Sequence, residues 1–279
     1  MIRRRQLIAM LGGAAAWRPL AVRAQQPDRL RQLGVLMGLA ETDQVLTAAT
    51  DPAATAAKAA TQTIPIIFVV GSDPVKLGLV ARVNRPGGNA TGINILTSTL
   101  EAKRLGLLHD LVPQAPLIGV LMNPNYGPAE NQVRDIQEAA RAIGLRIEVL
   151  RSSTDLELAS AFETIEQQHI AAIIVAADPF IDTRRDRIVA FAARVGVPAM
   201  YQFREHAFAG SLMSYGVDIA DVYRQFGVYV GRVLNGAKPA DLPVMQPIKF
   251  EFVINLKTAK ALGVKFSADL LSLADEVIE

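Results

Sequence analysis

The stretch Ile64-Pro65-Ile66-Ile67-Phe68-Val69-Val70 is an unbroken apolar run rich in β-branched residues. Such a run is typical of a strand that is buried on both faces, as in a parallel sheet. Gly71 and the Asp73-Pro74 pair end the run with a turn. We expect a helix over Val75–Val83, a Gly-rich turn and a second strand over Ala90–Ile93. This order predicts one βαβ unit and an α/β fold.

Two polar residues, Ser72 and Asp73, directly follow the carboxyl end of this strand. In open α/β sheets, ligands bind in the crevice beyond the carboxyl ends of the strands. Asp73 also suits the position that caps the following helix. Capping does not exclude ligand contact, so both interpretations stay open.

The N-terminal 24 residues have the order of a bacterial signal peptide. Arg3–Arg5 form a charged segment, Leu7–Ala16 an apolar one, and Val22-Arg23-Ala24 a small-residue cleavage site. The apolar segment is too short to span a bilayer, which needs roughly 20 apolar residues. The pair Arg4-Arg5 fits a twin-arginine export signal. We therefore expect a periplasmic protein that is cleaved after Ala24.

The charge balance changes once this segment is removed. The full chain has 29 Lys and Arg against 27 Asp and Glu, and residues 1–24 contain five Arg and no acid. The remainder has 24 basic and 27 acidic residues, so the alkaline pI of about 8.9 belongs to the export signal. We therefore expect no nucleic-acid partner. The chain has no cysteine, which excludes disulfides and thiol nucleophiles, and we predict neither a metal nor a cofactor.

Strand and helix patterns alternate along the rest of the chain, which predicts parallel sheets with helices on both faces. The expected strands are Gln32–Met37, Val45–Ala48, Leu117–Met122, Arg146–Leu150, Ala171–Ala177, Pro198–Gln202, Gly210–Tyr215 and Ile248–Ile254, the last alternating in polarity. The expected helices include Ala53–Thr61, Ser98–Val112, one from Pro128 to Gly144, one capped by Thr154, one from Asp182 through Arg194, Ile219–Leu234, Lys257–Leu262 and Ala268–Val277.

The connection between the first two strands is unusually short. Only Leu39–Gln44 and Gly38 separate Gln32–Met37 from Val45–Ala48. Parallel neighbours need a crossover of about a dozen residues, usually a helix. Either these strands are not parallel neighbours, or a βα portion is missing here.

Several motifs, in this order and spacing, carry a family resemblance across nearly the whole chain after residue 24. They are Ile64–Val69 with Ser72-Asp73-Pro74, Arg85–Gly92, Asn123-Pro124, Gly210–Gly216, Val253–Ala259 and Ala274–Glu279. The chain resembles periplasmic substrate-binding proteins of bacterial ABC transporters, in the family that includes tryptophan-binding-protein-like receptors.

The resemblance implies a type I periplasmic binding fold, with two Rossmann-like lobes that have parallel sheets and a ligand between them. Lobe one would comprise residues 27–96 and 216–243, and lobe two residues 97–215 and 244–279. Members of the family carry roughly one and a half more βα units where Leu39–Gln44 stands here. The resemblance therefore implies a truncated lobe one, with an exposed sheet edge.

Polar groups from both lobes should converge on the ligand. Each of these residues also suits a turn or a helix cap. Lobe one offers Thr47, Asp51, Ser72 and Asp73, lobe two offers Asn123, Asn125, Tyr126 and Asp178, and Tyr215 lies near a hinge. A ligand carboxylate would favour the start of the helix after Tyr126, and an ammonium group would favour Asp73 or Asp178.

The resemblance implies a monomeric solute-binding component of an ABC importer, not an enzyme. It would capture a small polar solute, such as an amino acid, and deliver it to an inner-membrane permease. Two alternatives remain: an exported α/β hydrolase that uses Asp73 or Asp178, and a truncated binding protein with impaired ligand binding. The hydrolase is the weaker of these, because the chain lacks a G-x-S-x-G elbow, a Walker loop and a G-x-G-x-x-G motif.

Overall fold

The computed structural model describes residues 45–95 and 100–279. All of them belong to one compact unit, Gln32–Glu279. The predicted signal peptide, the predicted strand Gln32–Met37 and the connector Leu39–Gln44 lie outside the described residues. Within the described part of the chain, no helix has the length and apolar character needed to cross a membrane.

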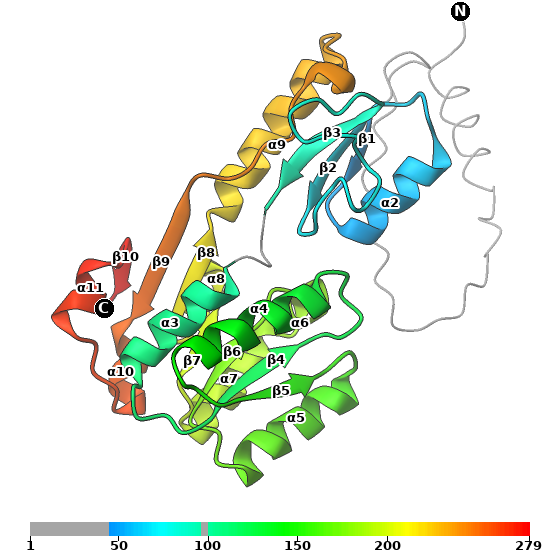
Figure 1. The fold of residues 1–279 in the computed structure, drawn as a ribbon. Helices are drawn as coiled ribbons and strands as arrows, with labels where there is room; N and C mark the ends of the chain where they lie inside the picture. The colour runs from blue at the N-terminus through cyan, green and yellow to red at the C-terminus, as the bar shows by residue number, and fades with distance from the viewer. Residues whose placement is uncertain (1–44, 96–99) are drawn as a thin grey trace, which may run out of the picture. The chain divides into compact units, whose positions relative to one another are not determined.

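The described strands form two separate sheets (Figure 1). The first has the order β1-β2-β3, with β1 at Leu46–Ala48, β2 at Ile66–Val70 and β3 at Ala90–Asn94. Both pairs are parallel, with Phe68 opposite Ala48 on one side and Gly92 on the other. All five residues of β2 are buried, as expected of a strand covered on both faces.

The second sheet has seven strands in the order β10-β9-β8-β7-β6-β4-β5. The strands are β4 (Ile118–Met122), β5 (Ile147–Arg151), β6 (Ala172–Val175), β7 (Ala199–Tyr201), β8 (Met213–Val217), β9 (Phe250–Asn255) and β10 (Glu276–Ile278). All neighbours are parallel except β8 and β9, which pair antiparallel. The second sheet is therefore mixed rather than wholly parallel.

The helices cover these sheets. Those before β8 are α2 (Asp51–Ala60), α3 (Glu101–Leu111), α4 (Ala129–Ala142), α5 (Asp155–Gln167), α6 (Pro179–Thr183), α7 (Arg185–Val195) and α8 (Arg204–Phe208). Those after it are α9 (Ile219–Leu234), the 3₁₀ turn η2 (Pro239–Asp241), α10 (Leu256–Leu262) and α11 (Ala268–Ser272). The bounds of α9 agree with the prediction, and Thr154 caps α5 as expected, accepting from Glu157 N at 3.2 Å.

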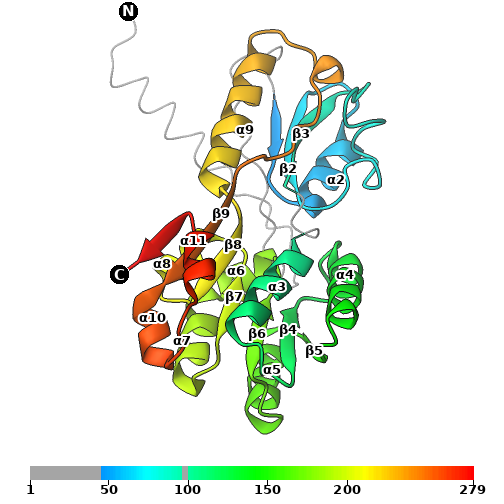
Figure 2. The same ribbon diagram turned by 60° about the vertical axis from the view of Figure 1, so that its left-hand side comes forward.

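We call the three-stranded sheet with α2, α9 and η2 lobe one, and the seven-stranded sheet with its helices lobe two. In lobe two, apolar residues of α3, α4, α10 and α11 form the core on one face, and those of α5, α6 and α7 form the core on the other. In lobe one, α2 packs on one face of the sheet and α9 on the other. Figure 2 shows α9 alongside β2 and β3. The two-lobe α/β fold is confirmed, whereas the exact lobe boundaries stay a prediction.

Among the described elements, the chain passes from one lobe to the other at three places. These lie between β3 and α3, between β8 and α9, and between Met245 and β9. Met245 forms an isolated parallel bridge with Ile93 of β3 before the chain continues into β9. The crossing strands share a small apolar cluster that includes Val69, Val217 and Val222.

The helix predicted over Val75–Val83 is wrong. The structure has a series of turns there, which begins with Leu77 N donating to Asp73 O at 3.0 Å. Gly78 adopts a left-handed conformation with φ of 70°, which interrupts any helical run. β2 and β3 are still parallel neighbours, so the crossover between them is irregular rather than helical.

Three further boundaries differ from the predictions. Asp178, not Asp182, caps a helix here, so that Asp182 lies inside α6 and a separate helix, α7, begins at Arg185. The helix expected over Ala268–Val277 ends at Ser272, and the chain then forms the edge strand β10. The predicted alternation in β9 is also wrong, because its last four residues are all buried.

Candidate functional site

In lobe one, Asp51 organises the turn that follows β2. It lies in the first turn of α2 with 5% of its surface exposed, while Thr50 caps the helix by accepting from Ala53 N at 3.3 Å. Asp51 Oδ1 accepts from Gly71 N at 2.9 Å, and its Oδ2 accepts from the Ser72 hydroxyl. The structure thus brings Asp51 and Ser72 together at the carboxyl ends of β1 and β2.

The other two predicted residues of lobe one have different settings. Asp73 is exposed, and its Oδ1 accepts from Val75 N at 2.8 Å and from Lys76 N at 3.4 Å. This is the turn-forming role that the sequence left open, although no helix follows. Thr47 lies half-buried within β1 rather than beyond its end.

In lobe two, Asn123 and Asp178 also come together. Asn123 Nδ2 donates to Asp178 Oδ2 at 3.0 Å, and Ile181 N donates to Asp178 Oδ1 at 2.9 Å as the cap of α6. Asp178 is only 4% exposed, and this burial raises the pKa of its carboxyl group. Asn123 and Asp178 follow β4 and β6, which are adjacent in the sheet, so two carboxyl ends meet here.

The segment between β4 and α4 begins with a tight turn. Asn123 Oδ1 accepts from Asn125 N at 2.9 Å, so Asn125 serves the turn and is itself exposed. Tyr126 is half-buried and packs against Met122 and Ala129. No side chain caps the start of α4, where the sequence predicts that a ligand carboxylate binds.

The polar ends of the two lobes approach one another at Gly127. A Cβ atom placed on Gly127 would lie 3.6 Å from Ser72 Oγ and 3.7 Å from Asp51 Oδ2. These are ordinary contact distances, so the turn after β4 lies directly against the Asp51–Ser72 pair. Four predicted residues, Asp51, Ser72, Asn123 and Asn125, therefore belong to one region.

Tyr215 stands apart from this group. It lies half-buried in β8. Its ring is stacked with that of Phe250, with 6.3 Å between the ring centroids, and lies edge-on to that of Phe252, with 6.4 Å between the centroids, and both phenylalanines are in β9. Its carbonyl oxygen accepts from Arg104 Nε at 2.8 Å. Tyr215 thus packs between the antiparallel strands β8 and β9.

A buried ion pair that was not predicted from the sequence lies at the start of α3. Arg104 Nη1 lies 2.9 Å from Glu101 Oε1, with the two side chains 0% and 1% exposed. Burial raises the pKa of Glu101 more than the Arg104 charge lowers it. Gln132 Nε2 joins the pair at 3.4 Å from Glu101 Oε1 and donates to Ala177 O at 3.1 Å. A signal was present, because Glu101 and Arg104 share a helical face with Leu105 and Leu108.

The same edge of lobe two carries a second missed group. Asp182 Oδ1 accepts from Gln202 Nε2 and lies 3.5 Å from His206 Nε2. Gln202 directly follows β7, which is the neighbour of β6, so this group continues the row that Asn123 and Asp178 begin. His206 and Gln202 are almost fully buried, with exposures of 2% and 0%.

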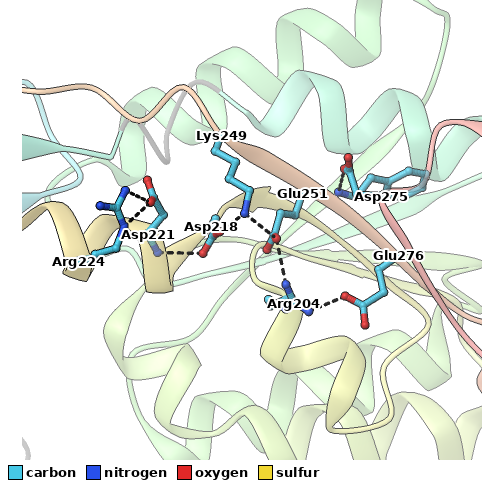
Figure 3. A network of polar contacts seen from close by, with 9 residues as sticks. Arg204, Asp218, Asp221, Arg224, Lys249, Glu251, Asp275 and Glu276 are labelled. Atoms are coloured by element: carbon cyan, nitrogen blue, oxygen red, sulfur yellow. Dashed lines mark hydrogen bonds and ion pairs between the residues drawn. The ribbon is translucent and has the colours of Figure 1, made fainter.

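A charged network ties the strands that cross between the lobes (Figure 3). Asp218, between β8 and α9, accepts from Lys249 Nζ at 2.5 Å, and its backbone N donates to Lys249 O at 3.2 Å. Lys249 precedes β9, where Glu251 accepts from Arg204 Nη1 at 2.9 Å. Arg204 also reaches Glu276 of β10 at 2.5 Å. The outgoing and returning strands are therefore held to one another where they leave lobe two.

The comparisons with known proteins agree with this architecture. A tyrosine-binding protein of Clostridioides difficile (strain R20291) is 29% identical over 232 residues, which cover 83% of this chain and 66% of that protein. The chain thus spans just under two thirds of that relative's length. An ABC domain from Streptococcus pneumonia in complex with L-Trp is 28% identical, with a TM-score of 0.74 over 84% of this chain and 80% of that one.

A conserved domain protein from Vibrio cholerae O1 biovar eltor has a TM-score of 0.76 at 26% identity, over 84% of this chain and 78% of that one. The type I periplasmic binding fold inferred from the sequence is thereby confirmed. The profile of the family described as "ABC transporter substrate binding protein" matches residues 30–278. The match covers almost the whole chain, and the protein belongs to the family of ABC transporter substrate binding proteins.

Proposed function

We propose that this protein is the extracytoplasmic solute-binding component of an ABC importer and that its solute is an amino acid, with aromatic amino acids the first to test. The observation that carries the proposal is the meeting of polar groups from both lobes around Gly127, where Asp51 and Ser72 face the turn that Asn123 begins. Convergent polar groups in one concave site are what recognition of a small zwitterion requires.

The names of two relatives support the choice of ligand, since one is a tyrosine-binding protein and the other was solved with L-Trp. Both α-ammonium and α-carboxylate groups have suitable partners here. The carboxyl groups that follow β6, Asp178 and Asp182, suit the ammonium group, and the start of α4, which no described side chain caps, suits the carboxylate.

A thermal-shift screen of the twenty standard amino acids against the protein beginning at Gln25 tests the proposal. A ligand that binds only the folded state stabilises it by about 2.7 kcal/mol at a hundredfold excess over Kd. We expect L-tyrosine or L-tryptophan to raise the Tm, and isothermal titration to give one site per chain. Turnover of an ester or phosphoester panel without any amino-acid binding would instead favour the hydrolase alternative.

We further propose that the protein acts in the periplasm and passes its solute to an inner-membrane permease. The N-terminal Arg4-Arg5 pair and the cleavage pattern at Ala24 support export through the twin-arginine route. Replacing both residues, Arg4→Lys with Arg5→Lys, should stop mature protein from appearing in the periplasm. Mature-length protein in the periplasm of the double variant would contradict the twin-arginine route.

A further inference from the structure

The carboxyl edge of the sheet in lobe two holds more carboxyl groups than cationic side chains. Glu101, Asp178 and Asp182 lie here with Arg104, whose charge Glu101 already balances at 2.9 Å. Neither Asp178 nor Asp182 forms an ion pair with a Lys or Arg among the residues that the structure describes. A cationic group of a ligand would therefore find a carboxyl group here that has no Lys or Arg partner and can ionise to pair with it.

Only one of these carboxyl groups is accessible. Glu101 and Asp178 are 1% and 4% exposed. Both oxygens of Asp178 already accept hydrogen bonds, one from Asn123 Nδ2 and one from the backbone N–H of Ile181. The side chain of Asp182 is 32% exposed. A ligand at this edge can therefore reach Asp182 without displacing any existing hydrogen bond of Asp178.

Buried polar atoms beside Asp182 lack partners. Gln202 donates to Asp182 through Nε2, but its Oε1 has no hydrogen-bond partner in the described part of the chain. His206 Nε2, 3.5 Å from Asp182 Oδ1, is also buried without a hydrogen-bond partner among the described residues. Gln202 Oε1 and the Nε2 of a neutral His206 can both accept, and an ammonium group has three hydrogens to donate.

The contacts of His206 indicate which of the two groups, His206 or Asp182, carries a proton in the ligand-free protein. Its Nδ1 lies 3.2 Å from Phe203 O, a contact in which Nδ1 must carry hydrogen. In the neutral ring Nε2 then has a lone pair, and this atom faces Asp182 Oδ1 at 3.5 Å. A protonated Asp182 beside a neutral His206 fits this arrangement.

The charges around the pair favour the same state. Although 32% of the Asp182 side chain is exposed, the protein packed around it and the neighbouring Asp178 raise its pKa to about 8. Glu205 adds to the rise, and Arg185 and Arg104 oppose it. Burial lowers the pKa of His206 to about 4, helped by Arg185 and Arg104 and opposed by the Phe203 carbonyl and Asp186. Both shifts favour a proton on Asp182 rather than on His206.

We propose that Asp182 binds the α-ammonium group of the ligand and gives up its own proton to solvent as this ion pair forms. The proposal rests on the proposed function, because it requires an amino-acid ligand. The exchange is balanced: neutral Asp182 and a cationic ligand become a carboxylate–ammonium pair and one free proton. Binding should therefore be linked to pH even though the ligand keeps its charge between pH 6 and 8.

The test is isothermal titration of L-tyrosine and L-tryptophan at pH 6, 7 and 8, in two buffers with different ionisation enthalpies. For whichever amino acid binds, we expect release of close to one proton at pH 6 and affinity that rises up to tenfold per pH unit. Asp182→Asn should weaken binding at pH 8 at least tenfold and abolish both proton release and pH dependence. Asp110→Asn, a matched change at an exposed aspartate in the last turn of α3, should behave as the wild type.

The outcomes separate the two proposals. Binding without proton release, with Asp182→Asn within twofold of the wild type, would overturn the role of Asp182 and leave the proposed function intact. No binding of either amino acid, or of the other standard ones, would overturn both. Should Asp182→Asn fail to fold, the analogue 3-(4-hydroxyphenyl)propionate, which lacks the ammonium group, gives a second test on the wild type: it should release no proton, and release equal to that with L-tyrosine would contradict the proposal.

Discussion

The two lobes are built from the same kind of unit but differ greatly in how much structure supports each sheet. In lobe two, the strand β6 (Ala172–Val175) has β4 and β7 on either side within a sheet of seven strands. In lobe one, β2 (Ile66–Val70) is equally apolar and equally buried, but it is the centre of three strands in the part of the chain that the structure describes. Its neighbour β1 is three residues long and has no second strand partner among the described residues.

The central strands are equally buried in the two lobes, so any difference in stability between the lobes must come from the rest of each sheet. Among the described residues β1 is an edge strand, and the sequence before it contains the short connector Leu39–Gln44, which is predicted to replace a helix, a strand and a helix. An edge strand with unpaired backbone groups is the weak point of a sheet. We therefore expect lobe one to be the less stable lobe and test this first.

The largest expected effect is a difference in hydrogen exchange between the two central strands. Loss of even a few hundred Å² of apolar burial at ~25 cal/mol per Å² forgoes several kcal/mol. The free energy of opening for the amides of Ile66–Val70 should therefore be several kcal/mol below that for Ile173–Val175. Native-state exchange followed by NMR or mass spectrometry measures both strands in one sample. Equal protection would show that lobe one is as stable as lobe two, and the hypothesis of a weakened lobe would be wrong.

The second prediction concerns a substitution that should remove the greater stability expected of lobe two. Arg104→Ala leaves the buried Glu101 carboxylate without its partner and Tyr215 O without a donor. Breaking a buried pair in this way costs about 3–5 kcal/mol, so the denaturation midpoint should fall and the protection of β6 should approach that of β2. Chemical denaturation with exchange on the variant gives both values.

An exposed pair provides the matched control. Arg224 and Asp221 lie 2.6 Å apart in α9 with 63% and 31% of their side chains exposed, and Arg224→Ala should change stability by no more than about 1 kcal/mol. If Arg104→Ala is as mild as Arg224→Ala, the buried pair contributes nothing to the difference between the lobes.

Much of this comparison could be predicted from the sequence, because long periodic segments fix strands and helices locally. The apolar run Ile66–Val70, the helix Ile219–Leu234 and the cap at Thr154 follow from such signals. Val75–Val83 failed because a glycine inside it takes a left-handed conformation, which apolar spacing does not reveal. The three-residue strand β10 failed because its pairing partner, β9, is distant in the sequence.

The site was predictable only in part, for a related reason. Asp51, Ser72, Asn123 and Asp178 follow directly from strand ends, which the sequence locates well. Glu101, Arg104 and Asp182 approach the site from helices, so that their place depends on how those helices pack. Their helical faces are visible in the sequence, but the depth of burial that makes them important is not.

The third prediction compares the aspartates that organise the two sheet edges. Asp51→Ala removes the acceptor for Gly71 N and Ser72, and Asp178→Ala removes the acceptor for Ile181 N and Asn123. A buried donor left without its acceptor costs about 1–3 kcal/mol. We expect Asp51→Ala to lower the Tm and the protection of β2 alone, and Asp178→Ala to act on β6 alone. Loss of protection in both strands from either change would show that the lobes unfold as one cooperative unit.

The smallest expected effect concerns the network that ties the crossing strands. The Lys249 ammonium group lowers the pKa of Asp218 by donating a hydrogen bond to its carboxylate. The backbone N–H of Asp221 also donates to this carboxylate and lowers the pKa further. A lowered carboxyl pKa stabilises the folded state above the ordinary value near 3.9, and the contribution is lost as pH falls through the folded-state pKa. The Tm difference between the wild type and Lys249→Met should therefore be small at pH 7 and vanish in acid. It should also shrink in about 1 M salt, because Lys249 is 59% exposed and the Debye length there is about 3 Å. Because Met keeps an aliphatic side chain of similar length, a large Tm loss that persists in high salt would contradict the prediction. It would mean that the hydrogen bond from Lys249 to Asp218 is worth far more than an exposed ion pair.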